Sequence, residues 1–187
     1  MVKIKACVFI SGQGSNLRNL IFHSREKNFP IKICLIISSK KDAYGIIYAR
    51  KYGIPYKIID TNTKNHTNEI LYFLRKYKIS FICLAGYMKI ISKKIISCYE
   101  NKIINIHPSL LPKFKGLNTF SRVLKNNEKK TGCTVHYVDS KLDNGRIITK
   151  KSFYLNKFDN EESLKLKTQQ LEYKAYPEAI IKIFKNR

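Results

Sequence analysis

Ile33-Cys34-Leu35-Ile36-Ile37 is a continuous run of apolar residues with no polar side chain inside it. Such runs are typical of strands in a parallel sheet, because helices cover both faces of that sheet. Outward from this run, short β-branched stretches alternate with helical patterns through the first half of the chain. Strands are expected at Ile4–Ile10, Ile31–Ile37, Pro55–Ile59 and Phe81–Ala85. The alternation predicts an α/β fold with a doubly wound, mostly parallel, Rossmann-like sheet.

The second half of the sequence predicts a different pattern. Further strands are expected at Lys102–Ile106, Gly132–Val138 and Arg146–Tyr154. The last two flank a turn at Asp143-Asn144-Gly145, which favours an antiparallel C-terminal strand region. A long helix is expected from Asn160 to Asn186, and Pro177 is expected to kink or divide it. No linker separates two parts of the chain, so residues 1–187 are expected to form one domain.

The formal net charge is +23, from 36 Lys and Arg against 13 Asp and Glu. A nucleic-acid surface would need these charges to cluster, but the lysines are spread along nearly the whole chain. A genome rich in A and T would raise Lys, Ile, Asn and Tyr together without selection for a partner. We therefore expect no specific nucleic-acid partner, although the charge attracts small anions.

The targeting and cysteine patterns point to the cytoplasm. The apolar run around Val8 is too short for a signal peptide, and no stretch approaches the roughly 20 apolar residues of a membrane helix. The five cysteines form no Cys-x-x-Cys pair, and an odd number does not close a disulfide framework. We expect reduced thiols, no membrane association and no metal.

Ser11-Gly12-Gln13-Gly14-Ser15-Asn16 joins the first expected strand to the first helix. Two glycines allow a tight turn close to a ligand, and the free N–H groups of a helix N-terminus favour phosphate. The loop lacks both the third glycine of the dinucleotide fingerprint and the ending of a Walker loop. From these residues alone, a phosphate cradle and a plain turn with Ser15 capping the helix are equally good interpretations.

A second candidate is Asn105-Ile106-His107-Pro108, at the end of an expected strand. Side chains at i and i+2 of a strand project to the same side, so the Asn105 amide and the His107 ring are expected together. Two N–H groups aimed at one point stabilise the charge that develops on a carbonyl oxygen under attack. The turn at Asp143 can bring a carboxylate to this histidine. Taken singly, a structural histidine and an ordinary hairpin turn explain these residues as well.

In this order and spacing, the three segments resemble the folate-dependent phosphoribosylglycinamide formyltransferases of purine synthesis. The resemblance covers essentially the whole chain, including Leu84–Ile91, Glu172 and Tyr176-Pro177. It implies an enzyme that moves the formyl group of 10-formyltetrahydrofolate to the amine of glycinamide ribonucleotide. The reaction would proceed by direct attack through an oxyanion, in a monomer or weak homodimer.

The resemblance also implies roles for individual residues. Asn105 and His107 would contact the formyl oxygen, while Asp143 would pair with His107 and assist proton movement. The phosphate would lie at Gly14, Ser15 and Asn16, with a second substrate contact region at Gln169, Gln170, Leu171 and Glu172. The folate would contact Met88, Lys89, Ile90, Ile91, Asn105, Asp139, Ser140, Lys141, Leu142 and Asp143. Lys64 is the weak match for an arginine that the family often carries.

Some positions depart from the family pattern. Lys115 stands where proline is usual, Asn118 where histidine is common, and Phe120-Ser121 where a His-Arg pair is common. We therefore expect this loop to sit differently and to alter secondary contacts and the pH response.

Three alternatives remain open at this point. Methionyl-tRNA formyltransferase shares the Asn-x-His element but normally carries a further C-terminal domain. Formyltetrahydrofolate hydrolase resembles the same catalytic domain but has a further N-terminal one. A nucleic-acid-binding protein without enzyme activity would explain the charge, but would leave Asn105, His107 and Asp143 without a purpose.

Overall fold

The first half of the chain folds around a parallel sheet. The computed structural model describes residues 2–185, and the chain divides into two units, Met1–Ile104 and Asn105–Arg187. In the first unit, hydrogen bonding orders the strands β3-β2-β1-β4. Their bounds are β1 (Ile4–Ile10), β2 (Ile31–Ser38), β3 (Tyr56–Ile58) and β4 (Phe81–Leu84), and all these neighbours are parallel. The expected α/β class and parallel sheet are confirmed in this unit.

Strand β5 (Ile103–His107) begins in the first unit and ends in the second. Its start follows β4, since the Ile82 amide donates to the Lys102 carbonyl over 2.8 Å. The strand includes His107 and stops before Pro108, which has no amide hydrogen to continue the ladder. The sequence thus located the end of this strand to within one residue.

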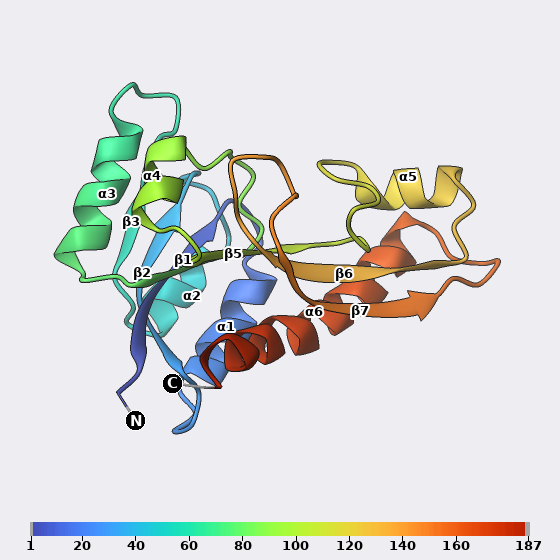
Figure 1. Ribbon diagram of the computed structural model, residues 1–187, viewed down its shortest axis with the longest axis horizontal. Coiled ribbons are helices and arrows are strands. Elements are labelled where there is room, and N and C mark those ends of the chain that lie inside the picture. Colours follow the sequence, from blue (N-terminus) through green and yellow to red (C-terminus); the bar gives the residue numbers. More distant parts are fainter. Residues whose placement is uncertain (1, 186–187) are drawn as a thin grey trace. The chain divides into compact units, whose positions relative to one another are not determined.

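Helices alternate with the strands of the first unit. They are α1 (Ser15–Ser24), α2 (Ile46–Lys51), α3 (His66–Lys76) and α4 (Lys93–Cys98). Helix α3 buries Ile70, Leu71 and Leu74 along one stripe, as an amphipathic helix does. It lies beside α4 (Figure 1). Ser92 caps the start of α4, because its hydroxyl accepts a hydrogen bond from the Ile95 amide.

The second unit combines an antiparallel strand pair with a long helix. Helix α5 (Thr119–Lys125) precedes strands β6 (Lys130–Tyr137) and β7 (Ile147–Tyr154), which pair antiparallel as expected. Helix α6 (Glu161–Phe184) packs along both strands (Figure 1). Its first turn is closed by a capping box between Asn160 and Ser163.

Helix α6 runs through Pro177 as one helix, so the expected division is wrong, whereas the expected kink stays a prediction. Ala175, Tyr176 and Ala179 around the proline are fully buried, so packing holds the helix where local propensity would interrupt it. The expected end at Asn186 lies outside the described residues.

The five cysteines are free thiols, as expected, and Cys7, Cys83 and Cys133 lie in the core. Among residues 2–185, no helix is both long and apolar enough to cross a membrane. Within the same range, no group of three His, Cys, Asp or Glu side chains is placed to hold a metal ion.

Candidate active site

The second unit brings Asn105, His107 and Asp143 together. Asn105 Nδ2 lies 3.5 Å from Asp143 Oδ1, and His107 Nδ1 lies 3.3 Å from Asp143 Oδ2. The His107 and Asp143 side chains are only 7% and 8% exposed. Because Asn105 and His107 are two residues apart on β5, both face the same carboxylate. The Asn105 amide and the His107 ring therefore converge on the Asp143 carboxylate.

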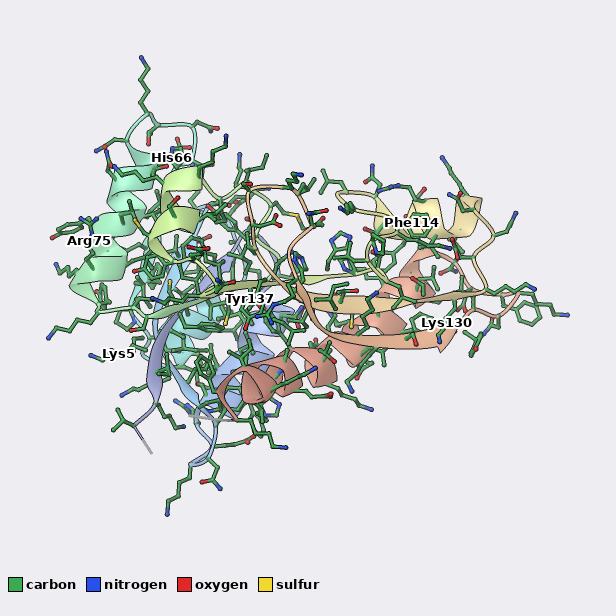
Figure 2. The ribbon with its side chains drawn as sticks, in the orientation of Figure 1. Lys5, His66, Arg75, Phe114, Lys130 and Tyr137 are labelled. Carbon is green, nitrogen blue, oxygen red and sulfur yellow. The ribbon has the colours of Figure 1, made fainter. Side chains whose placement is uncertain are left out.

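The His107 ring is held in a defined tautomer. Its Nε2 lies 2.8 Å from the carbonyl oxygen of Phe114, in the loop that leads to α5 (Figure 2). A carbonyl only accepts hydrogen bonds, so Nε2 carries the proton. In the neutral ring, Nδ1 then presents a lone pair toward Asp143. This nitrogen is the ring atom that can gain a proton during a reaction.

The pKa values of both partners are shifted downward. Burial lowers the pKa of His107, although the Phe114 carbonyl and the Asp143 charge partly oppose this shift. Burial would raise the pKa of Asp143, but contacts with His136, the Gly116 amide and His107 together bring it below its ordinary value. At neutral pH the pair is therefore a neutral imidazole beside an ionised carboxylate.

His136 is a fourth member of this cluster that the sequence analysis did not single out. Its Nδ1 donates to the Tyr137 carbonyl over 2.8 Å, which leaves the Nε2 lone pair facing Asn105 Nδ2 at 3.3 Å. The same Nε2 lies 3.7 Å from Asp143 Oδ1, and the residue is 2% exposed. His136 thus orients the Asn105 amide. Only the alternation of buried positions along β6 could have indicated it from sequence.

The Asp143 carboxylate is aimed inward by the turn that carries it. Asp143 has a left-handed backbone with φ 46°, and the Gly116 amide donates to its Oδ2 over 2.9 Å. Gly145 allows the turn to close, since a Cβ there would lie 1.8 Å from the Tyr137 carbonyl oxygen. A turn that looks ordinary in sequence therefore positions a buried carboxylate beside His107.

The glycine loop of the first unit has the geometry expected at a helix N-terminus. Gly14 adopts φ 75° and ψ 22° before α1, and a Cβ there would lie 2.5 Å from the Gly45 Cα. Gly14 is the N-cap, with no side-chain cap, so the interpretation of Ser15 as the capping residue is wrong. Ser15 and Asn16 lie in the first turn of α1, whose N–H groups favour an anion.

Ser11 connects this loop to the segment expected to bind folate. Its hydroxyl accepts from the Met88 amide over 2.9 Å and shares a hydrogen bond of 2.6 Å with Ser39. Met88, Lys89 and Ile90 are exposed, with 86% exposure at Ile90. Ile91 is instead buried in the core, so its side chain anchors this segment to the core and is not exposed to a ligand. Lys64 is exposed in the turn before α3.

The other expected contacts lie in the second unit. An Asp139 carboxylate oxygen accepts from the Lys141 amide over 2.8 Å, which shapes a loop where Ser140, Lys141 and Leu142 are exposed. On α6, Gln170 is exposed while Gln169, Leu171 and Glu172 are half-buried. Burial and, after it, the Glu172 charge raise the pKa of Cys133 on β6 to about 12, and α6, which carries Glu172, packs against β6.

Comparison with known proteins identifies the family of the chain. The sequence model of the formyl transferase family matches residues 4–180. The chain belongs to the formyl transferase family. Phosphoribosylglycinamide formyltransferase of Haemophilus influenzae is 38% identical over 186 residues, which cover 96% of this chain and 86% of that protein. The resemblance seen in the sequence is confirmed.

Other members of the formyl transferase family extend the comparison. The human trifunctional purine biosynthetic protein adenosine-3 is 36% identical over 95% of this chain, which matches 18% of its length. The phosphoribosylglycinamide formyltransferase structure from Brucella melitensis superposes with a TM-score of 0.92 at 36% identity, covering 100% of this chain and 97% of that one. The Bacillus halodurans structure of the same name gives 0.93 at 32% identity, covering 97% and 96%.

Proposed function

We propose that this chain is a phosphoribosylglycinamide formyltransferase of purine (IMP) biosynthesis. It transfers the formyl group of 10-formyltetrahydrofolate to the amine of glycinamide ribonucleotide. The observation that carries this proposal is the buried convergence of Asn105 and His107 on the Asp143 carboxylate. Family membership and the names of the relatives support the choice of substrates.

The proposed chemistry begins when the substrate amine attacks the formyl carbon. A nitrogen–carbon bond forms, and the electron pair of the carbonyl π bond moves to oxygen. The Asn105 amide and the positive charge of the His107 ring, once Nδ1 carries a proton, stabilise this oxyanion. The oxyanion then collapses, the bond from carbon to N10 of the folate breaks, and N10 receives the proton that the amine loses.

His107 and Asp143 are suited to move that proton. Nδ1 of the neutral ring accepts it, and the ionised carboxylate 3.3 Å away stabilises the resulting imidazolium. The lowered pKa of His107 makes the ring a weak base that readily gives the proton on. Holding the two substrates together supplies the remaining acceleration, which reaches about 7–11 kcal/mol in well-oriented reactions.

The binding roles follow from the chemistry of the exposed groups. Gly14, Ser15 and Asn16 bind the phosphate at the start of α1, where the helix dipole favours an anion. The half-buried carboxylate of Glu172 binds the glycinamide end, with Gln169, Gln170 and Leu171 beside it on α6. Met88, Ile90 and Leu142 offer exposed apolar surface for folate.

Wider properties complete the proposal. Residues 1–187 act as one formyltransferase domain, in keeping with a family match that spans both units. The free thiols suit the reducing cytoplasm. The protein uses no metal, and it is a monomer or a weak homodimer, which light scattering across a concentration series will measure.

The test is to incubate purified protein with 10-formyltetrahydrofolate and follow release of tetrahydrofolate. The proposal expects release that depends on added glycinamide ribonucleotide, with one formylated ribonucleotide formed per folate released. Release without the ribonucleotide would indicate a hydrolase. Formylation of methionyl-tRNA instead, or no release with any acceptor, would also overturn the proposal.

A further inference from the structure

The loop Phe114–Leu117 touches the His107–Asp143 pair twice. The Phe114 carbonyl accepts a hydrogen bond from His107 Nε2 over 2.8 Å. The Gly116 amide donates to Asp143 Oδ2 over 2.9 Å. Lys115 also donates to the Asn144 side chain over 2.7 Å, next to Asp143. The position of this loop therefore decides the tautomer of the ring and the orientation of the carboxylate.

The backbone conformation of this loop is unfavourable without contacts from other residues. Phe114, Gly116 and the following Asn118 have φ of 58°, 78° and 54°, all in the left-handed region. A bulky residue such as Phe seldom adopts this conformation, and it persists only where surrounding contacts impose it.

Arg122, on α5, supplies those contacts. Its Nη1 donates to the Lys115 carbonyl over 2.6 Å and lies 3.4 Å from the Leu117 carbonyl. Its guanidinium carbon lies 5.5 Å from the centre of the Phe114 ring. The flat face of a guanidinium can lie on an aromatic ring while one of its nitrogens, here Nη1, contacts two carbonyls. A lysine ammonium lacks that flat face.

We propose that Arg122 is a positioning residue, which clamps the Phe114–Leu117 loop and so fixes the His107 ring and the Asp143 carboxylate for the reaction. This inference rests on the proposed function for its kinetic consequence but not for its structural one. It also gives a role to a loop that departs from the family pattern at Lys115 and is followed by further departures at Asn118, Phe120 and Ser121.

The clamp works against a competing arrangement. Three charged or titratable groups act on His107: Asp143, His136 and Arg122. Without the Phe114 carbonyl, the ionised carboxylate would draw the ring proton from Nε2 to Nδ1, because N–H to carboxylate hydrogen bonds are strong. Nδ1 would then no longer be available to accept a proton.

The test measures the tautomer of His107 by ¹⁵N NMR of the histidine rings, of which the chain has four. We expect the Nε2–H form in the unmodified protein and a clear population of the Nδ1–H form in Arg122→Met. Arg122→Lys keeps the charge but loses the flat guanidinium, so we expect a smaller population of the Nδ1–H form than in Arg122→Met. Arg25→Met is the matched control, since Arg25 lies 4.7 Å over the Tyr52 ring in the first unit.

Kinetics give the second measurement. We expect kcat to fall about tenfold in Arg122→Met, as when a charged hydrogen bond is lost, with KM for the ribonucleotide nearly unchanged. A tautomer identical to that of the unmodified protein in both Arg122 variants would overturn the clamp, whatever the activity. Absence of transfer in the unmodified protein would instead overturn the proposed function and leave the NMR result standing.

Discussion

Replacement of Asp143 by Asn tests the central pair, because it removes the charge and keeps the shape of the side chain. The carboxylate lies 3.3 Å from His107 Nδ1, and its side chain is 8% exposed. At that distance, a charge pair with an effective dielectric constant of about 20 interacts by ~5 kcal/mol. The amide dipole and local water recover part of this energy, so we expect a net loss of ~3–4 kcal/mol when the imidazolium forms.

That energy corresponds to a decrease in kcat of about two to three orders of magnitude. The assay is single-turnover release of tetrahydrofolate with both substrates saturating, together with thermal unfolding to show that the fold persists. Asp159→Asn is the matched control, because Asp159 pairs with Lys167 at 2.6 Å in the same unit but belongs to no expected site. A rate for Asp143→Asn within tenfold of the unmodified protein, or an equal decrease in the control, would refute the reasoning.

Three further outcomes follow from the same geometry. The pKa values of His107 and Asp143 are both lowered. As pH decreases, kcat/KM should therefore stay level through neutral pH and fall only below about 6.5, the ordinary pKa of histidine. A decrease in kcat/KM that already begins above about pH 7 on acidification would contradict this. Gly14→Ala places a Cβ 2.5 Å from the Gly45 Cα at a φ of 75°. Chemical denaturation should therefore show a decrease of ~1–3 kcal/mol in the free energy of unfolding, and KM for the ribonucleotide should rise. An unchanged free energy of unfolding and an unchanged KM would contradict tight packing at Gly14. Burial opposes ionisation of Asp159, but contacts with Lys167, the Asn156 amide and Ser163 lower its pKa to about 2. The stability that Asp159 adds should therefore be complete above its unfolded pKa of about 3.8 and disappear as pH falls through 2. Urea unfolding at a series of pH values will show whether the free energies of unfolding of Asp159→Asn and the unmodified protein become equal near pH 2.

The sequence predicted the convergence of Asn105, His107 and Asp143 more accurately than the contacts within that cluster. The i, i+2 spacing on one strand predicted that Asn105 and His107 face one way, and both face Asp143. The residues of the turn itself favoured an ordinary hairpin, since Asp-Asn-Gly is common there, and only the resemblance singled out Asp143. His136 was not singled out, because a buried histidine on a strand has no local signal that separates it from a core residue.

The sequence alone determined the alternation of strands and helices and the start of the first glycine turn. It did so because side-chain periodicity and the steric freedom of glycine are local properties of the chain. Only the tertiary structure decided that α6 continues through Pro177 and that Gly14 rather than Ser15 caps α1. It also decided that His107 donates a hydrogen bond from Nε2 to the Phe114 carbonyl. Each of these depends on atoms that come close only when distant segments pack, and no spacing along the chain carries that information.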